Sequence, residues 1–279
     1  MGSSLSSIPY ITIRRTLIFN IPPTLQVAQQ LLESAEIVDN YLQKITRSSS
    51  NTAARQQYNY SPAELSLTAR NVIQSSLDSM CVKIPKRLLL DLKSVNVVVL
   101  NETAESGMPH TRPPNIICVP PVLPNIQTII HELWHIHQRL YKNQWNTFYR
   151  EQWSFESWRG ILPKKLERQR RLNPDTVDSP LWIWNSIWVP VPIMVDLSYP
   201  ELGKIDVWFF NANTGTYLHD IPDDMLLFFS MHNGGGKGAY EHPRELSAYM
   251  LSELNTVAYT PSFAYKKLVQ YFGEIAVFK

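Results

Sequence analysis

The strongest constraint on this chain is a predicted helix that places two histidines and a glutamate close together. The helix is expected from Asn125, a suitable N-cap, to about Tyr141, because apolar residues recur every three or four positions. His131 and His135 lie one above the other on such a helix, so their imidazole nitrogens can hold one Zn²⁺. Glu132 projects about 100° round the axis, beside the metal, where a carboxylate can take a proton from water. The alternative is a surface helix with two unrelated histidines.

A catalytic zinc centre needs a third protein ligand and one open position. We favour Glu245, on a helix expected over Pro243–Leu254. Ala248 and Ser252 share the face of Glu245 and are small enough for this face to lie close against the first helix. Alternatively, Glu245 is a first-turn glutamate that the helix dipole favours.

Other residues near this second helix are alternative ligands or neighbours of the metal. His242 is the leading alternative ligand, followed by Glu241 and His232. Tyr249 lies on the same face as the favoured ligand, where it could donate a hydrogen bond to an oxyanion or pack in the core. The glycine-rich segment 233–238 predicts either a flap over the site or a plain surface loop.

The run His131–His135 resembles the H-E-x-x-H signature of the zincin metallopeptidases. With Gln138 the match is similar to the H-E-x-x-H-x-x-Q variant, so the close resemblance covers about eight residues. Glu245 followed by Ala248 is similar to the third-ligand helix of the gluzincins, in which a glutamate completes the zinc site. Tyr141 stands where the metzincins have a third histidine, which excludes that subclass.

The resemblance implies a zinc-dependent peptidase that pairs an extended substrate with an edge strand of its sheet. The run Asn115–Val119 would be that strand, because prolines on both sides favour the edge of a sheet. The chain departs from the gluzincin pattern in two ways. The 110 positions from His135 to Glu245 exceed the spacing in compact gluzincins, and Tyr249 stands where many members have an acidic residue.

Periodicity and the resemblance together predict an α+β, zincin-like fold in a single domain, residues 1–279. We expect N-terminal helices (1–90), a small mixed sheet with the zinc helix (91–141), an aromatic-rich insertion (142–232), and the third-ligand helix with a C-terminal helix (233–279). Helices are predicted at 22–46, at 61–80 with Ser61-Pro62 and Glu64 as its capping box, at 243–254 and at 261–272, a polar loop at 47–57, and strands at 94–100, 115–119 and within 181–210.

Composition separates the insertion from the rest of the chain. All eight tryptophans lie between Trp134 and Trp208. They predict either the core of an accessory subdomain, or a hydrophobic substrate pocket or docking surface. The basic run Lys164–Arg171 is expected to be a solvated helix face. With 26 basic and 24 acidic residues the net charge is +2, which argues against a nucleic-acid partner.

The N-terminus fits a lipidation consensus. Residues 1–6 read M-G-S-S-L-S, in which Gly2 would accept a myristoyl group, and the alternative is a serine-rich start without modification. Membrane contact is expected only if Gly2 is acylated. We find no apolar stretch long enough to span a membrane and no secretory signal, and the two cysteines are too few for a disulfide scaffold. We therefore expect an intracellular protein, with membrane or virion association as the alternative.

The sequence thus predicts zinc-dependent hydrolysis of a peptide or protein substrate. His131, His135 and Glu245 would hold Zn²⁺, and Glu132 would activate the attacking water. Two other functions stay open. One is a catalytically silent structural or assembly protein, for instance in a virion or at a membrane. The other is a non-peptidase zinc hydrolase acting on an amide or ester.

Overall fold

The computed structural model describes residues 17–55, 59–230, 236–252 and 262–272. It is an α+β fold with two small sheets. The helices are α1 (Leu25–Asp39), α2 (Tyr41–Thr46), α3 (Ser49–Arg55), α4 (Leu67–Met80), α5 (Lys86–Asp91), α6 (Ile126–Leu140), α7 (Lys142–Trp153), α8 (Lys164–Gln169), α9 (Asp223–Phe229), α10 (Pro243–Ser252) and α11 (Phe263–Phe272). Short 3₁₀ turns η1 (Cys81–Lys83), η2 (Ala104–Gly107) and η3 (Gly236–Glu241) join some of them. The strands are β1 (Ile18–Asn20), β2 (Ser94–Val99), β3 (His110–Arg112), β4 (Ile116–Val119), β5 (Phe155–Ser157), β6 (Trp182–Trp184), β7 (Trp188–Met194), β8 (Ile205–Asn211) and β9 (Tyr217–Leu218).

The first sheet has the order β1-β2-β4-β3, in which β1, β2 and β4 run parallel and β3 runs antiparallel to β4. The predicted mixed sheet is therefore confirmed, but the prediction that Asn115–Val119 forms its edge is wrong. Strand β4 lies between β2 and β3, and all four of its residues are buried. The edge next to β4 is formed by His110–Arg112, a run too short and too polar to be recognised as a strand, and β1 forms the other edge. The prolines around β4 mark its ends without placing it at the edge.

The predicted helix 22–46 is two helices, α1 and α2, because Asn40 adopts a left-handed conformation with φ 51°. Its backbone N–H donates to the Glu36 carbonyl and ends α1, while Thr24 caps the N-terminus by accepting from the Val27 N–H. Asparagine tolerates this conformation better than most residues. The spacing of apolar residues continues on both sides of Asn40, so it does not predict the break.

Two other expectations about the N-terminal region are also wrong in detail. Helix α4 begins at Leu67 with Ser66 as its cap, so the capping box expected at Ser61 and Glu64 does not form. Pro62 instead forms a bridge with Leu100 at the end of β2. The segment expected as a polar loop after α2 contains the short helix α3.

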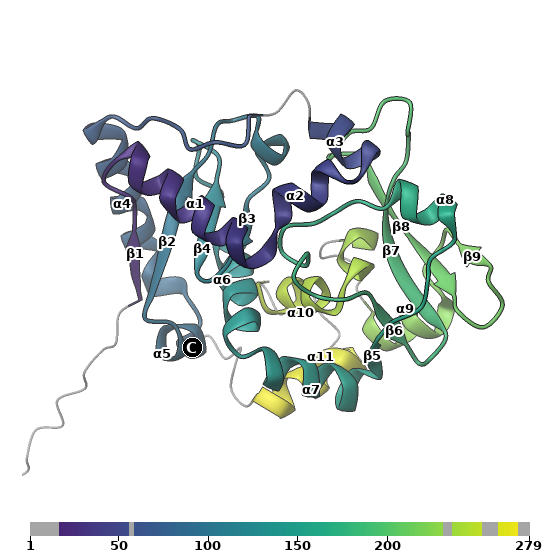
Figure 1. The fold of residues 1–279 in the computed structure, drawn as a ribbon. Helices are drawn as coiled ribbons and strands as arrows, with labels where there is room; N and C mark the ends of the chain where they lie inside the picture. Colours follow the sequence, from purple (N-terminus) through teal and green to yellow (C-terminus); the bar gives the residue numbers. More distant parts are fainter. Residues whose placement is uncertain (1–16, 56–58, 231–235, 253–261, 273–279) are drawn as a thin grey trace, which may run out of the picture.

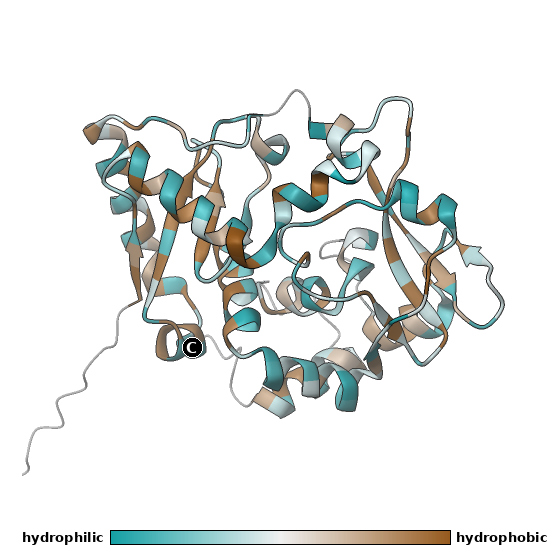
Figure 2. Ribbon diagram, in the orientation of Figure 1, coloured by the Kyte–Doolittle hydropathy of each residue, from teal (hydrophilic) through white to brown (hydrophobic). Residues whose placement is uncertain are grey.

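The aromatic-rich insertion builds the second sheet, β5-β6-β7-β8-β9, in which every neighbouring pair is antiparallel. Trp145 and Trp153 on α7 are fully buried, as are Phe155 on β5 and Phe209 on β8. The buried tryptophans therefore serve as core, and they belong to the same apolar cluster as β1 and α10 rather than to a separate one. In Figure 2 the strands of the second sheet carry many apolar residues, whereas α8 is mostly polar.

Helices α6 and α10 lie between the two sheets (Figure 1) and pack directly against each other. One continuous cluster of buried apolar side chains extends from β1 through α6 and α10 to α11. The cap of α6 is the predicted Asn125, whose Oδ1 accepts from the Thr128 N–H at 2.9 Å. Among the described residues, none of the helices has the length and apolar character required to cross a bilayer.

Candidate metal centre

His131, His135 and Glu245 converge at the contact between α6 and α10. The two histidine Nε2 atoms lie 2.9 Å apart, and Glu245 Oε2 lies 3.2 Å from that of His131 and 3.5 Å from that of His135. Tetrahedral zinc with bonds of about 2.0–2.2 Å separates its ligand atoms by about 3.3 Å. The donor set and its spacing therefore fit a zinc ion at the centre of this triangle, and one potential ligand atom from each side chain lies within 4.8 Å of the others.

Two side chains of this triangle, His135 and Glu245, are each oriented by an amide on the far side. His135 Nδ1 lies 2.9 Å from Gln138 Oε1, which directs the opposite nitrogen, Nε2, to the centre. The Gln138 amide nitrogen in turn donates to the Arg244 carbonyl at 3.0 Å, which ties α6 to α10. Asn173 donates to Glu245 Oε1 at 3.0 Å, so Oε2 is left to face the histidines. Hydrogen bonds of this kind hold metal ligands in a fixed orientation.

The charges of the cluster reinforce one another. Burial alone would raise the pKa of Glu245, but His135 and His131 outweigh it and hold that pKa well below its usual value. Burial lowers the pKa of His135, and the nearby carboxylates, Glu245 first, more than compensate and raise it to about 9. Protons and a metal ion therefore compete for the same inward-facing nitrogen.

Glu132 lies beside this triangle with a carboxylate that is only partly satisfied. Its side chain is 3 % exposed, and its Oε2 has no hydrogen-bond partner among the described residues. Burial raises the pKa of Glu132, and the neighbouring Asp175 raises it further. A buried carboxylate with a free oxygen and a raised pKa is suited to receiving a proton from a bound water.

A cavity of about 390 Å³ opens directly onto this cluster. His131, Glu132 and Glu245 line it from α6 and α10, His110 lines it from β3, and Asp175 lines it from the loop between α8 and β6. The cavity therefore gives the centre the open side that a catalytic metal requires.

The alternative ligands from the sequence lie elsewhere. His242 accepts the Arg244 backbone N–H through Nδ1 at 3.0 Å and lines a different cavity. Glu241 accepts a hydrogen bond from Asn173 and is not part of the triangle, although it lines the same cavity as the metal cluster. The structure thus brings Glu245 to the two histidines and keeps both alternatives out of the ligand set.

Tyr249, which the sequence predicts as a neighbour of the metal, lies against His131. Its ring is 4.5 Å from the His131 ring, edge to face, and it lines the cavity. Burial and the adjacent Glu245 raise its pKa well above its usual value, so it remains a hydrogen-bond donor. Gly2, His232 and the start of the glycine-rich segment lie outside the described residues.

The sheet edge next to the centre does not present a free backbone. The Thr111 N–H of β3 donates to Asp175 Oδ1 at 2.6 Å. The Thr111 carbonyl accepts from Arg139 Nη2 at 3.3 Å. These side chains occupy backbone groups that a substrate strand would need, so pairing of a peptide with this edge is not supported as it stands.

Asn173 and Asp175 were missed by the sequence analysis. They lie on a loop between α8 and β6, where no periodic pattern or motif marks them. Comparison of the chain with protein-family models, with curated proteins and with solved structures found no match.

Proposed function

We propose that this protein is a zinc-dependent peptide hydrolase with a zincin-like arrangement of helices around the metal. The observation on which the proposal rests is the triangle of His131, His135 and Glu245, with the buried Glu132 carboxylate beside it and a cavity in front. Such a set of ligands and base recurs in enzymes that hydrolyse amide bonds. The long insertion between the second and third ligands supplies Asn173 and Asp175, which support the centre from outside the two helices.

The residues of the chain have distinct tasks in this proposal. Zn²⁺, when bound, polarises a carbonyl oxygen and lowers the pKa of a water molecule. Glu132 accepts the proton from the attacking water and passes it to the departing amine. Gln138 and Asn173 keep the ligand atoms facing inward, and Tyr249, which lines the cavity and stays protonated, donates a hydrogen bond from its hydroxyl to the developing oxyanion.

The decisive variant is Glu132→Gln, which keeps the size of the side chain and removes its ability to accept a proton. We expect zinc content by mass spectrometry to equal that of the wild type, while cleavage of a casein-derived peptide mixture falls by about 10²- to 10⁴-fold. Glu156→Gln, an exposed glutamate on β5, is the matched control and should cleave normally.

Equal cleavage by the wild type and Glu132→Gln would refute the proposed role of the glutamate. A zinc-loaded wild type that hydrolyses small esters or amides but no peptide would identify a non-peptidase hydrolase. A zinc-loaded wild type that hydrolyses none of these would favour a structural role, and a protein that binds no zinc would remove the basis of both hydrolase assignments.

A further inference from the structure

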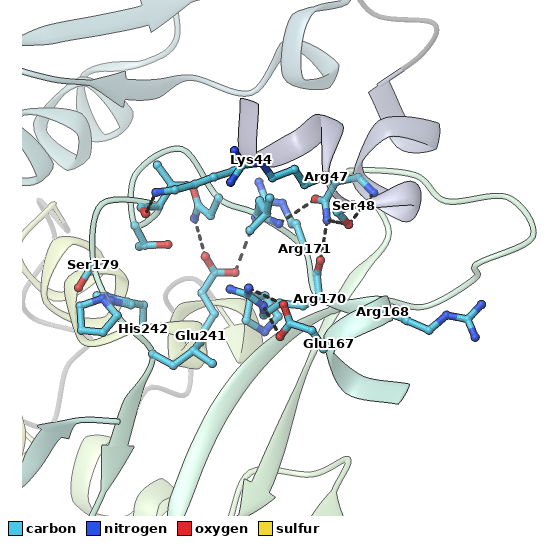
Figure 3. A pocket seen from close by; sticks show the side chains of 18 of the residues that line it. Lys44, Arg47, Ser48, Glu167, Arg168, Arg170, Arg171, Ser179, Glu241 and His242 are labelled. Carbon is cyan, nitrogen blue, oxygen red and sulfur yellow. Dashed lines mark hydrogen bonds and ion pairs between the residues drawn. The ribbon is translucent and has the colours of Figure 1, made fainter. Parts of the chain in front are cut away.

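A second cavity, of about 490 Å³, lies beside the metal centre and is rich in basic side chains (Figure 3). It is formed where α2 faces the chain that follows α8. Its basic lining residues are Lys44, Arg47, Arg168, Arg170 and Arg171, of which Arg168 extends away from the others in Figure 3. Its acidic lining residues are Glu167 and Glu241.

This lining differs from what the basic run Lys164–Arg171 was expected to form. The run is only partly a solvated helix face, since Arg170 and the buried Arg171 face a cavity together with residues of α2. Arg170 is paired with Glu167 at 2.7 Å and Arg171 lies 3.6 Å from Glu241, so Lys44 and Arg47 leave a positive surplus in a protein whose total net charge is only +2. The guanidinium group of Arg47 is exposed and has no side-chain partner in the described part of the chain. Such a concave positive site attracts anions.

The cavity lining contains hydrogen-bond donors that have no acceptor within the described part of the chain. His242 is 5 % exposed, and its Nδ1 accepts the Arg244 N–H, which places its proton on Nε2. That Nε2 has no partner among the described residues, nor has Nε of Arg171. Buried donors without an acceptor are costly, and an oxygen of a bound anion would satisfy them.

The two cavities are neighbours. Arg171, Asn173 and Glu241 line both of them. Asn173 also donates to both Glu241 and Glu245, so the wall between the cavities is connected by hydrogen bonds to the third ligand. A substrate peptide bound across the metal centre could therefore extend its neighbouring residues into the second, positively charged cavity.

We propose that this second cavity binds an anionic side chain, carboxylate or phosphate, of the same peptide whose scissile bond lies at the metal centre. This inference rests on the proposed peptidase function and adds a preference for acidic or phosphorylated substrates. The Arg47 guanidinium matches the two oxygens of either group, and the His242 N–H supplies a further donor. Side-chain recognition of this kind also replaces the strand pairing that the occupied β3 edge does not offer.

The test measures binding separately from cleavage. Zinc-loaded Glu132→Gln protein is titrated into rhodamine-labelled decapeptides of one alanine–glycine sequence, which carry two adjacent glutamates, two phosphoserines or two glutamines. We expect fluorescence anisotropy to give a Kd at least tenfold lower for the glutamate or phosphoserine peptide than for the glutamine peptide. The glutamate and phosphoserine arms distinguish the two sources of negative charge, and rising salt should weaken both.

The variant Arg47→Gln/Arg170→Gln removes two cations of the cavity at exposed or half-exposed positions. We expect it to bring the anionic peptides to the affinity of the glutamine peptide. The control Arg150→Gln/Arg159→Gln makes the same change in net charge at exposed arginines outside the cavity and should preserve the discrimination.

Equal binding of the three peptides, or equal losses in the two double variants, would overturn the inference. Binding of inorganic phosphate without any preference among the peptides would also overturn it. The outcome is separate from that of the proposed function: if the wild type cleaves no peptide but the Glu132→Gln protein still discriminates through Arg47 and Arg170, the peptidase assignment fails and the anion site stands.

Discussion

At the scale of single residues, the buried pair of Arg55 and Glu105 joins distant parts of the chain. Arg55 donates from Nε and Nη2 to the two Glu105 oxygens at 2.7 and 2.9 Å, and both side chains are almost fully buried. Arg55 also donates to the Tyr41 hydroxyl and to the Leu172 carbonyl. The pair therefore fixes α3 to η2 and to the loop that leads to the metal centre.

This pair predicts a loss of stability in acid. Burial alone would raise the pKa of Glu105, but Arg55 reverses the effect and lowers it from its ordinary value near 4.5. The carboxylate therefore contributes stability above pH 4.5, and that contribution is lost as the pH falls toward the lower pKa of the folded state. Glu105→Gln should lower the free energy of unfolding at pH 7 by about 3–5 kcal/mol, because it leaves Arg55 buried and unpaired.

Urea unfolding of both proteins from pH 7 to pH 3 checks this prediction. The difference between the wild type and Glu105→Gln should shrink below pH 4.5. If the difference in free energy of unfolding stayed constant from pH 7 to pH 3, Arg55 would not lower the pKa of Glu105 in the folded protein.

The residues of the site differ in how far the sequence predicts them. His131, Glu132 and His135 share a short local motif, and helical geometry alone places them together. Glu245 could be proposed because a helix with small residues on one face was visible. Asn173 could not, because it reaches Glu245 from an irregular loop 72 positions away, and no local pattern encodes such a contact.

At the scale of elements, helix α6 supplies both histidines, so its N-terminal cap supports the centre. Asn125→Ala should reduce the free energy of unfolding by about 1 kcal/mol, because the Thr128 N–H loses its acceptor. Urea denaturation measures the change. Asn125→Asp keeps the acceptor and places a negative charge at the positive end of the helix, so it should match the wild type or exceed it. An alanine variant as stable as the wild type would contradict this role.

Long amphipathic helices such as α6 and α10 were predictable because their hydrophobic period is sustained over several turns. Strand β3 and the break at Asn40 were not, since three residues show no period and a left-handed residue leaves the pattern on both sides intact. Residues 181–210 were recognisable as strands, but their arrangement as a second sheet depends on pairings between separate segments.

At the scale of the whole molecule, the three proposed ligands join α6 to α10 across 110 positions of sequence, so only the folded chain presents them together. Zinc should therefore stabilise the fold by about 4 kcal/mol at a free concentration a thousandfold above its Kd. In a protein of this size that corresponds to a Tm roughly 10 °C higher.

Differential scanning calorimetry of the zinc-loaded and chelator-treated protein tests this coupling. Glu245→Ala should show little zinc-dependent shift, whereas the exposed variant Glu156→Gln should show the full one. An unchanged Tm after complete removal of metal from the wild type would mean that zinc binding does not stabilise the folded state.

The confinement of every tryptophan to positions 134–208 gives the molecule an uneven optical signal. Intrinsic tryptophan emission would come from α6, α7, the second sheet and Trp158, which directly follows β5. Helices α1 to α5 contribute no such fluorophore. Unfolding followed by fluorescence therefore reports the half of the protein that contains the metal helix, and only circular dichroism registers a separate melting of the N-terminal helices.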